Sequence, residues 1–438
     1  MLTVLALAAQ AQPASTPLDL ATVIAAAVAH SDSVQESRAA AQSARAKVDQ
    51  VASREMPQLA LNANGVEFSK TQSLNFGGQT IQAVPLHQET LNLQLNQLLD
   101  LTNQVGTGIS QAKLYALSAS YQLQSSTEDA ELTAVTDYYN VLRAEQNVRV
   151  AQASLTDTQE QLKTSNDLWR GGVGEKINVY RATSQVANAQ ELVEQRNNEL
   201  DAARSALNDL IGRPLNQPLT LKEVLPPAPL QVNSAFPPAD EATFDRAALA
   251  DKALNQRPEV LAAHVAERAA EKGIKLARAS NEPTVVLGLG GNYYPTPSFQ
   301  DLTRSIGVLT LGVTVPIFDG GLAGAEVREA KAGVDTAKST EDQIRRAVAL
   351  QVQDAALDVD TAQRQLDASE AGLQAAIVAR KLAQTRYEAQ VGIYLEVTDA
   401  EAALTAAQTA QVQAAYDLLT ARARLRRAVG DELTPSSL

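Results

Sequence analysis

The sequence predicts a mainly helical protein in which long antiparallel coiled-coil helices are combined with membrane-spanning strands. Three observations predict this fold class. Alanine is abundant and aromatic residues make up only 4% of the chain, a composition that suits helices packed at close range. Two very long stretches lack proline, and two pairs of short segments alternate between apolar and polar side chains. These features recur in both halves of the chain, which indicates a duplicated architecture.

The first residues are typical of an export signal. An apolar run from Leu2 to Ala9 is followed by Ala9-Gln10-Ala11, the small-x-small pattern of a cleavage site. The first cationic residue is Arg38, so the basic segment that normally opens a signal peptide is missing. We therefore interpret residues 1–11 as the remnant of a signal peptide. The alternative is a frayed apolar N-terminus.

The rest of the chain is an internal duplication. Residues before position 58 recur 226 positions later, and residues from Asp100 onward recur 219 and then 218 positions later. The offsets predict a first repeat at 12–212, a proline-rich linker at 213–243, a second repeat at 244–430 and a C-terminal tail at 431–438. The matches include Asp19 with Asp245, Val34 with Val260, Asp100 with Asp319, and Gly174 with Gly392.

Each repeat contains a pair of predicted strands, at about 58–68 and 89–99 in the first and about 284–293 and 305–318 in the second. Every second residue is apolar, and about 10 such residues cross a bilayer at a tilt. Four strands cannot close a barrel, so entry into lipid requires several copies of the chain. The alternative is a soluble four-stranded sheet packed under the helices. The clearest apolar positions are Leu91, Leu93, Leu95, Leu309, Leu311, Val313, Val315 and Ile317.

The predicted long helices span 102–168 and 322–386, each roughly 100 Å at 1.5 Å per residue. Two shorter helices are predicted at 19–54 and 177–211. Placed end to end, they have about the same length as one long helix. The heptad repeat of the segment 177–211 indicates left-handed coiled-coil pairing, in which two positions of each heptad form a seam facing the partner helix. Alanines at the second of these seam positions permit close approach of the two helices. The first seam position is occupied by Val179, Val186, Val193, Leu200 and Leu207.

The composition excludes several classes of function. Fifty acidic residues outnumber 37 basic residues, giving a formal net charge of −13, which argues against nucleic acid as a partner. The absence of cysteine excludes disulfides and thiolate ligands, and the three histidines lie far apart in the sequence, which argues against a metal centre. The segment Gly171 to Lys176 lacks the spacing of a phosphate-binding loop. We expect no enzyme, no cofactor and no metal.

One string of residues carries a family resemblance. A strand followed by Pro316-Ile317-Phe318-Asp319-Gly320-Gly321, a long helix and the turn from Tyr387 to Gly392, all within a duplicated chain, resembles the TolC-like outer-membrane efflux protein family. The first repeat keeps only Asp100 of the junction string. The resemblance implies a homotrimer in which four strands per protomer form a 12-stranded outer-membrane β-barrel. That barrel continues into a periplasmic α-barrel, and the linker 213–243 would occupy its equatorial region.

The same resemblance implies a function and a set of partners. The chain would be a passive exit duct of a tripartite efflux or type I secretion system in the outer membrane of a two-membrane bacterium. Its partners would be outer-membrane lipid, a periplasmic adaptor protein and an inner-membrane pump or transporter. The alternative is a soluble periplasmic coiled-coil scaffold without a pore.

Three groups of site residues follow from the resemblance. The junction motif comprises Pro316, Phe318, Asp319, Gly320 and Gly321. We expect the two helix-to-helix turns to lie farthest from the strands and to dock the adaptor, and the loop from Gln72 to Pro85 to lie outside the cell. The docking residues are Trp169, Gly172, Val173 and Gly174 in the first turn and Tyr387, Val391 and Gly392 in the second.

The third group is an acidic ring at the periplasmic entrance. Glu396 and Asp399 are three residues apart, so they share one helix face. Asn178 and Arg181 occupy the matching positions of the first repeat, so only the second repeat would supply the ring. The alternative is that both carboxylates lie in a first helical turn and stabilise the helix dipole.

Overall fold

The computed structural model describes residues 17–84, 86–222, 245–295 and 304–433. The predicted signal remnant and most of the linker and tail lie outside these residues. The chain forms two compact units, and each draws on both repeats. The first unit contains Leu123–Pro258 and Arg345–Leu438 together with the segment before Arg38, and the second contains Arg38–Gln122 and Glu259–Ile344.

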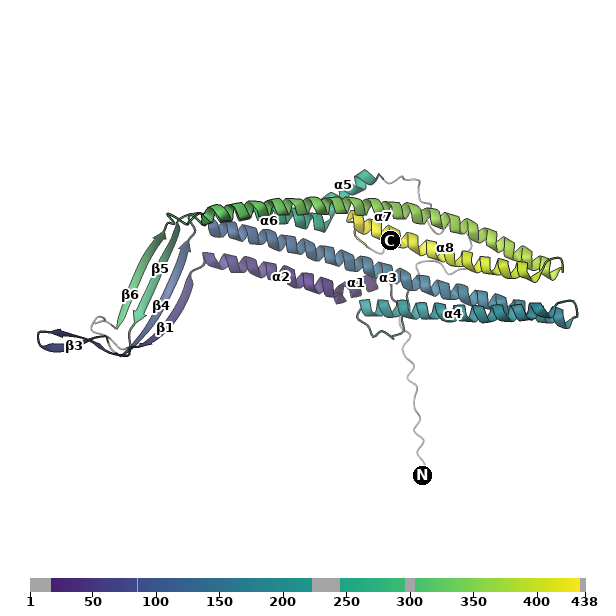
Figure 1. Cartoon of the computed structure of the whole chain (residues 1–438), viewed down its shortest axis with the longest axis horizontal. Coiled ribbons are helices and arrows are strands. Elements are labelled where there is room, and N and C mark those ends of the chain that lie inside the picture. Colours follow the sequence, from purple (N-terminus) through teal and green to yellow (C-terminus); the bar gives the residue numbers. More distant parts are fainter. Residues whose placement is uncertain (1–16, 85, 223–244, 296–303, 434–438) are drawn as a thin grey trace, which may run out of the picture. The chain divides into compact units, whose positions relative to one another are not determined.

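The second unit contains one antiparallel sheet of four strands in the order β1-β4-β5-β6 (Figure 1). The strands are β1 (Gln58–Glu67), β4 (His87–Leu99), β5 (Thr284–Tyr293) and β6 (Ser305–Thr314). All four strands were predicted, but the last was predicted to continue to residue 318. It ends at Thr314 because Pro316 has no backbone N–H to donate to a sheet.

The strand register separates the side chains of this sheet into two faces. Leu61 pairs with Leu93, and Leu95 pairs with Leu289, which in turn pairs with Leu309. Because paired residues point to the same side of a sheet, these leucines form one apolar face. On the other face, the Asn92 amide donates a hydrogen bond to the Asn292 carbonyl oxygen. The apolar face is strongly exposed: Leu61 retains 68% and Leu309 71% of its accessible surface.

A second hairpin occupies the segment that was predicted to be a loop. β2 (Gln72–Phe76) pairs with β3 (Gln79–Val84) in antiparallel register, joined by Gly77 and Gly78, which both have positive φ. The loop prediction was wrong because a Gly-Gly pair between two short strands is a hairpin signal. Pro85, the end of the predicted loop, lies outside the described residues.

The helices recur in the same order in both repeats. α1 (Leu20–His30) and α2 (Asp32–Ala52) correspond to α5 (Arg246–Gln256) and α6 (Pro258–Ala279). α3 (Gln104–Arg170) and α7 (Leu322–Glu388) contain 67 residues each. They are followed by α4 (Lys176–Leu210) and α8 (Tyr394–Val429), while a short 3₁₀ turn, η1 (Ser53–Glu55), follows α2. None of the described helices combines the length and apolarity that a membrane crossing requires.

The core of the first unit is built around tyrosines. Tyr138 and Tyr139 on α3 are each 1% exposed, and Tyr139 also lies 6.4 Å from the ring of Tyr416 on α8. Leu219 and Leu221, in the described part of the predicted linker, are buried in the same core. The described start of the linker is therefore packed against the helices.

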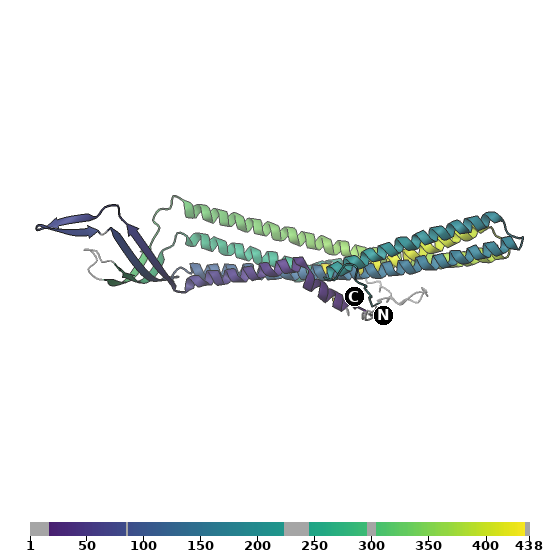
Figure 2. The ribbon, with the colours of Figure 1, turned by 90° about the horizontal axis from the view of Figure 1, so that it is seen from below.

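In the second unit, two side-chain hydrogen bonds join α3 to α6. The Ser118 hydroxyl donates to the Ala262 carbonyl, and the Gln111 side-chain amide donates to the Ala269 carbonyl, both at 3.0 Å. Figure 2 shows α6 and α7 in a second view, with α6 in teal and α7 in green.

Candidate functional site

The two helix-to-helix turns have the same backbone geometry. In the α3–α4 turn, the Leu168 carbonyl accepts from the backbone N–H of Val173 at 3.1 Å and of Gly174 at 2.9 Å. In the α7–α8 turn, the Arg386 carbonyl accepts from Val391 at 2.9 Å and Gly392 at 3.0 Å. We call the parts of α3, α4, α7 and α8 next to these turns the hairpin region; they all belong to the first unit.

The turn geometry explains the three predicted glycines of the two turns. Gly172 has φ +78°, where a side chain is strained, although Gln390 adopts φ +60° at the matching place. A Cβ on Gly174 would lie 2.9 Å from Cβ of Leu168, and a Cβ on Gly392 would lie 3.0 Å from Cβ of Arg386. The last glycine of each turn therefore lets the returning chain pass against the preceding helix.

Both turns present exposed apolar side chains. Trp169 is 40%, Val173 61% and Val391 73% exposed. The Lys176 ammonium lies 5.5 Å from the ring centre of Trp169 and 5.6 Å from that of Tyr180, a distance that allows cation–π attraction. The exposed set continues into the next helices with Ile177, Tyr180, Ile393 and Leu395.

Tyr387 requires a correction, because it does not contribute to the exposed surface of its turn. It is only 7% exposed, and its ring packs edge-on against Tyr394 at 5.5 Å. Both tyrosines belong to one buried apolar cluster that also includes Ala182 of α4. Tyr387 therefore packs the α7–α8 hairpin against the α3–α4 hairpin. Adaptor docking remains a prediction for the exposed residues of the two turns.

The predicted acidic pair lies at the start of α8. Glu396 is in the first helical turn, and its Oε2 lies 3.6 Å from Nε of Arg386 across the α7–α8 turn. Asp399 is one turn further on and exposed. The helix-dipole alternative consequently applies to Glu396 and not to Asp399, because the dipole effect fades beyond the first turn. The adjacent Val397, on the seam of α8, is 1% exposed.

The hairpin region also contains an ion cluster that was not predicted from the sequence. Arg380 of α7 lies between two carboxylates: its Nε donates to Oε2 of Glu401 on α8 at 3.0 Å, and its Nη2 lies 3.2 Å from Oδ1 of Asp157 on α3. Glu401 is 7% exposed. Burial raises the pKa of its carboxyl above the ordinary value, while Arg380 opposes that shift.

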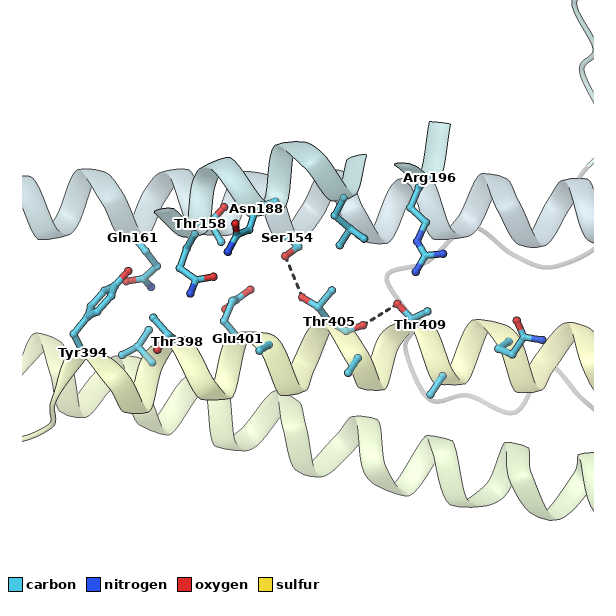
Figure 3. Close-up of a pocket in the computed structure, with 18 residues that line it drawn as sticks. Ser154, Thr158, Gln161, Asn188, Arg196, Tyr394, Thr398, Glu401, Thr405 and Thr409 are labelled. Atoms are coloured by element: carbon cyan, nitrogen blue, oxygen red, sulfur yellow. Dashed lines mark hydrogen bonds between the residues drawn. The ribbon is translucent and has the colours of Figure 1, made fainter. Parts of the chain in front are cut away.

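Glu401 also lines a cavity of about 650 Å³ bordered by α3, α4 and α8 (Figure 3). The seam of α3 is polar along this cavity, and the Thr405 hydroxyl of α8 donates to the Ser154 hydroxyl at 3.1 Å. Figure 3 shows Arg196 extending from α4 toward α8. Polar side chains in a coiled-coil seam fix the register of the helices at a cost in stability. The buried polar residues of the α3 seam are Ser154, Thr158, Gln161 and Ser165.

The junction motif forms the start of α7. The Asp319 carboxylate accepts from the backbone N–H of Gly321 at 2.8 Å and of Ala323 at 2.7 Å, and these hydrogen bonds lower its pKa. Asp100 caps α3 in the same way, accepting from Gln104 at 2.7 Å. Gly320 and Gly321 have φ of +66° and +91° with open space around them, so backbone conformation explains both glycines.

The other residues of the junction are exposed. Phe318 is 90% and Ile317 95% exposed, which is unusual for large apolar side chains. Pro316 ends the strand that precedes them, as described above. The junction motif thus combines a helix cap with an exposed apolar pair.

The comparisons with known proteins agree with this architecture. The family model described as "Outer membrane efflux protein" matches residues 23–213 and 249–431. The outer membrane efflux protein BepC of Brucella suis is 25% identical over 349 residues, which cover 78% of this chain and 72% of BepC. The alkaline protease secretion protein AprF of Pseudomonas aeruginosa is 25% identical over 71% of this chain, which spans only 63% of AprF.

A solved structure shows the same fold. The outer membrane protein VceC from Vibrio cholerae superimposes with a TM-score of 0.76 at 18% identity, over 95% of this chain and 97% of VceC. This chain and VceC therefore share one fold. The chain belongs to the outer membrane efflux protein family, which places it in the bacterial outer membrane with its helical part in the periplasm.

Proposed function

We propose that the chain is the outer-membrane exit duct of a tripartite efflux or type I secretion system and works as a homotrimer. The observation that carries this proposal is the four-stranded sheet, one face of which exposes leucines on all four strands. Such a face is stable against lipid, and its open edges require other copies of the chain to close a barrel. Three chains supply twelve strands.

The proposal assigns the exposed apolar turns to a periplasmic adaptor protein and, through it, to an inner-membrane pump or transporter. Single exposed apolar side chains are common, but here both turns gather several of them around a shared backbone geometry. BepC is named for efflux and AprF for secretion of a protease, so the relatives support a duct without selecting the cargo.

The acidic pair offers a test of the duct in isolation. Three protomers would place six carboxylates from Glu396 and Asp399 around one mouth, and a charge-lined opening concentrates counter-ions. We expect the reconstituted protein to favour cations in a planar bilayer. The double variant Glu396→Gln/Asp399→Asn should lose most of the cation-over-anion permeability ratio. Arg386→Gln should raise that ratio, because Arg386 lies 3.6 Å from Glu396.

A matched control separates selectivity from folding. Glu175 precedes α4 at the other turn and is exposed, so Glu175→Gln should leave the permeability ratio unchanged. If the double variant retains the wild-type ratio and melts at a lower temperature, the carboxylates act only as stabilisers of the helix start. The selective mouth would then lie elsewhere.

Adaptor docking is tested by crosslinking in cells, since the chain has no native cysteine. Cysteines introduced at Val173 and Val391 and coupled to a photoreactive maleimide should capture a periplasmic partner. A cysteine at Asp201, exposed on α4, serves as the control and should capture less. Crosslinks that arise from Ser73 on β2, but from neither turn, would reverse the proposed orientation.

A further inference from the structure

A histidine and two glutamates of the second unit converge between α6 and α7. His264 and Glu267 are three residues apart on α6, and Glu341 reaches them from α7. Nδ1 of His264 lies 3.4 Å from Oε2 of Glu341, and one potential ligand atom from each of the three residues lies within 4.8 Å of the others. We propose that His264, Glu267 and Glu341 form a binding site for one divalent transition-metal ion, with Zn²⁺ as the representative ion.

The arrangement has the chemistry of such a site. One imidazole and two carboxylates supply three ligands, and water can fill the fourth position of a tetrahedral ion. Ligand atoms about 2.0–2.2 Å from Zn²⁺ lie roughly 3.4 Å apart, so small side-chain rotations suffice to close the observed spacing. The imidazole favours Zn²⁺ and its transition-metal neighbours over Mg²⁺ and Ca²⁺, which prefer oxygen ligands alone.

Burial and charge distinguish this cluster from ordinary surface carboxylates. Glu341 is 8% exposed, and the side chain of Glu267 is 18% exposed, whereas His264 reaches solvent with 54% of its side chain exposed. A carboxylate oxygen of Glu267 and one of Glu341 lie within 4.8 Å of each other, so two like charges are held close together. A divalent cation would relieve the repulsion between the two carboxylates.

The duplication indicates that helix packing alone does not require these residues. In the first repeat, Arg38 and Ala41 occupy the positions that match His264 and Glu267, and Leu123 occupies the position that matches Glu341. The first repeat builds the corresponding helices without a histidine or a carboxylate at any of these places. The cluster is therefore specific to the second repeat.

The groups facing the cluster predict how its affinity can be changed. The Lys338 ammonium of α7 lies 3.9 Å from Oε1 of Glu267 and competes with a metal ion for that carboxylate. Glu271, one turn along α6, adds negative charge nearby. Removing Lys338 should therefore tighten metal binding. If the cluster were only a structural ion-pair network, the loss of this ion pair could only weaken helix packing.

The test uses the full-length protein purified in detergent without a histidine tag and stripped with a chelator. Zn²⁺ is titrated in competition with a chromophoric chelator. We expect one ion per chain with a dissociation constant in the micromolar range or below. His264→Ala and Glu341→Gln should each weaken binding by about 30-fold or more, and Lys338→Met should strengthen it several-fold. Mg²⁺ at millimolar concentration should not compete.

His87→Ala is the matched control. His87 also lies near a carboxylate, 3.8 Å from Glu67, but both side chains are exposed and the pair offers only two ligands. This variant should bind Zn²⁺ as the wild type does. X-ray absorption at the zinc edge, with one nitrogen and two carboxylate oxygens in the first shell, gives a readout independent of folding. Binding that survives His264→Ala, or that is lost equally in His87→Ala, overturns the proposal.

Discussion

Replacing Arg380 with alanine is expected to lower the free energy of unfolding of the hairpin region by about 2–3 kcal/mol at neutral pH. The variant leaves Glu401 with a buried carboxylate and no cation, and removing one member of a buried ion pair costs more than the pair itself contributes. The side chain of Arg380 is 24% exposed, so we place the effect below the range for fully buried pairs. Thermal unfolding followed by helical circular dichroism measures the change.

The pH dependence of this effect identifies its cause. The pKa of Glu401 is higher in the folded state than its ordinary value of 4.5. Protonation of this carboxyl therefore stabilises the fold fully below pH 4.5. That stabilisation is lost as the pH rises through the raised pKa. Removing Arg380 raises the folded pKa further. The Arg380→Ala defect should therefore be largest at neutral pH and small near pH 4.

The double variant Arg380→Met/Glu401→Gln provides the control for lost packing. It removes both charges and keeps side chains of similar size, so it should recover most of the stability. An Arg380→Ala defect of equal size at pH 4 and pH 7 would show that the methylene groups of Arg380, and not its charge, hold α7 against α8.

Introducing a cation on the apolar face of the sheet is expected to prevent assembly. A cationic side chain that faces lipid costs about 2–4 kcal/mol at mid-depth and about 0–1 kcal/mol near the membrane surface. Leu93 pairs with Leu61 in a central row of the sheet, so Leu93→Arg should abolish most of the trimer. Val313 is one residue from the end of β6, so Val313→Arg should impair assembly less. The trimer fraction after extraction from membranes is the measurement.

A polar-face variant is the control for this experiment. Asn92 neighbours Leu93 on β4 but points to the opposite face, where it bonds to Asn292. Asn92→Lys should therefore assemble far better than Leu93→Arg, despite losing that hydrogen bond. Equal tolerance of both changes would mean that the leucine face does not contact lipid.

The sequence was sufficient for the elements that depend on local pattern. Period-two alternation located all four strands of the sheet, and the absence of proline located both long helices, α3 and α7. Two local errors had signals that were available. Pro316 marks the end of β6, and the Gly77-Gly78 pair marks the β2–β3 hairpin.

The side-chain clusters that were not predicted depend on how distant helices are placed. Arg380 meets Asp157, which lies in the other repeat, and nothing in either local sequence indicates the pairing. The i,i+3 spacing of His264 and Glu267 is visible in the sequence, but Glu341 joins them only through the rotation of α7 about its axis. Burial of Tyr387 likewise required the packing of one hairpin on the other, since its turn resembles an exposed one in sequence.

We propose that three copies of this chain form a duct through the outer membrane. Electron cryomicroscopy of the full-length protein reconstituted in lipid nanodiscs tests it most directly. We expect three chains, a closed barrel of twelve strands inside the lipid disc with Leu61, Leu93 and Leu309 facing lipid, and a helical tube on one side. A protein that stays monomeric outside the disc, or whose leucine face packs against its own helices, would show that the chain does not form a trimeric membrane duct.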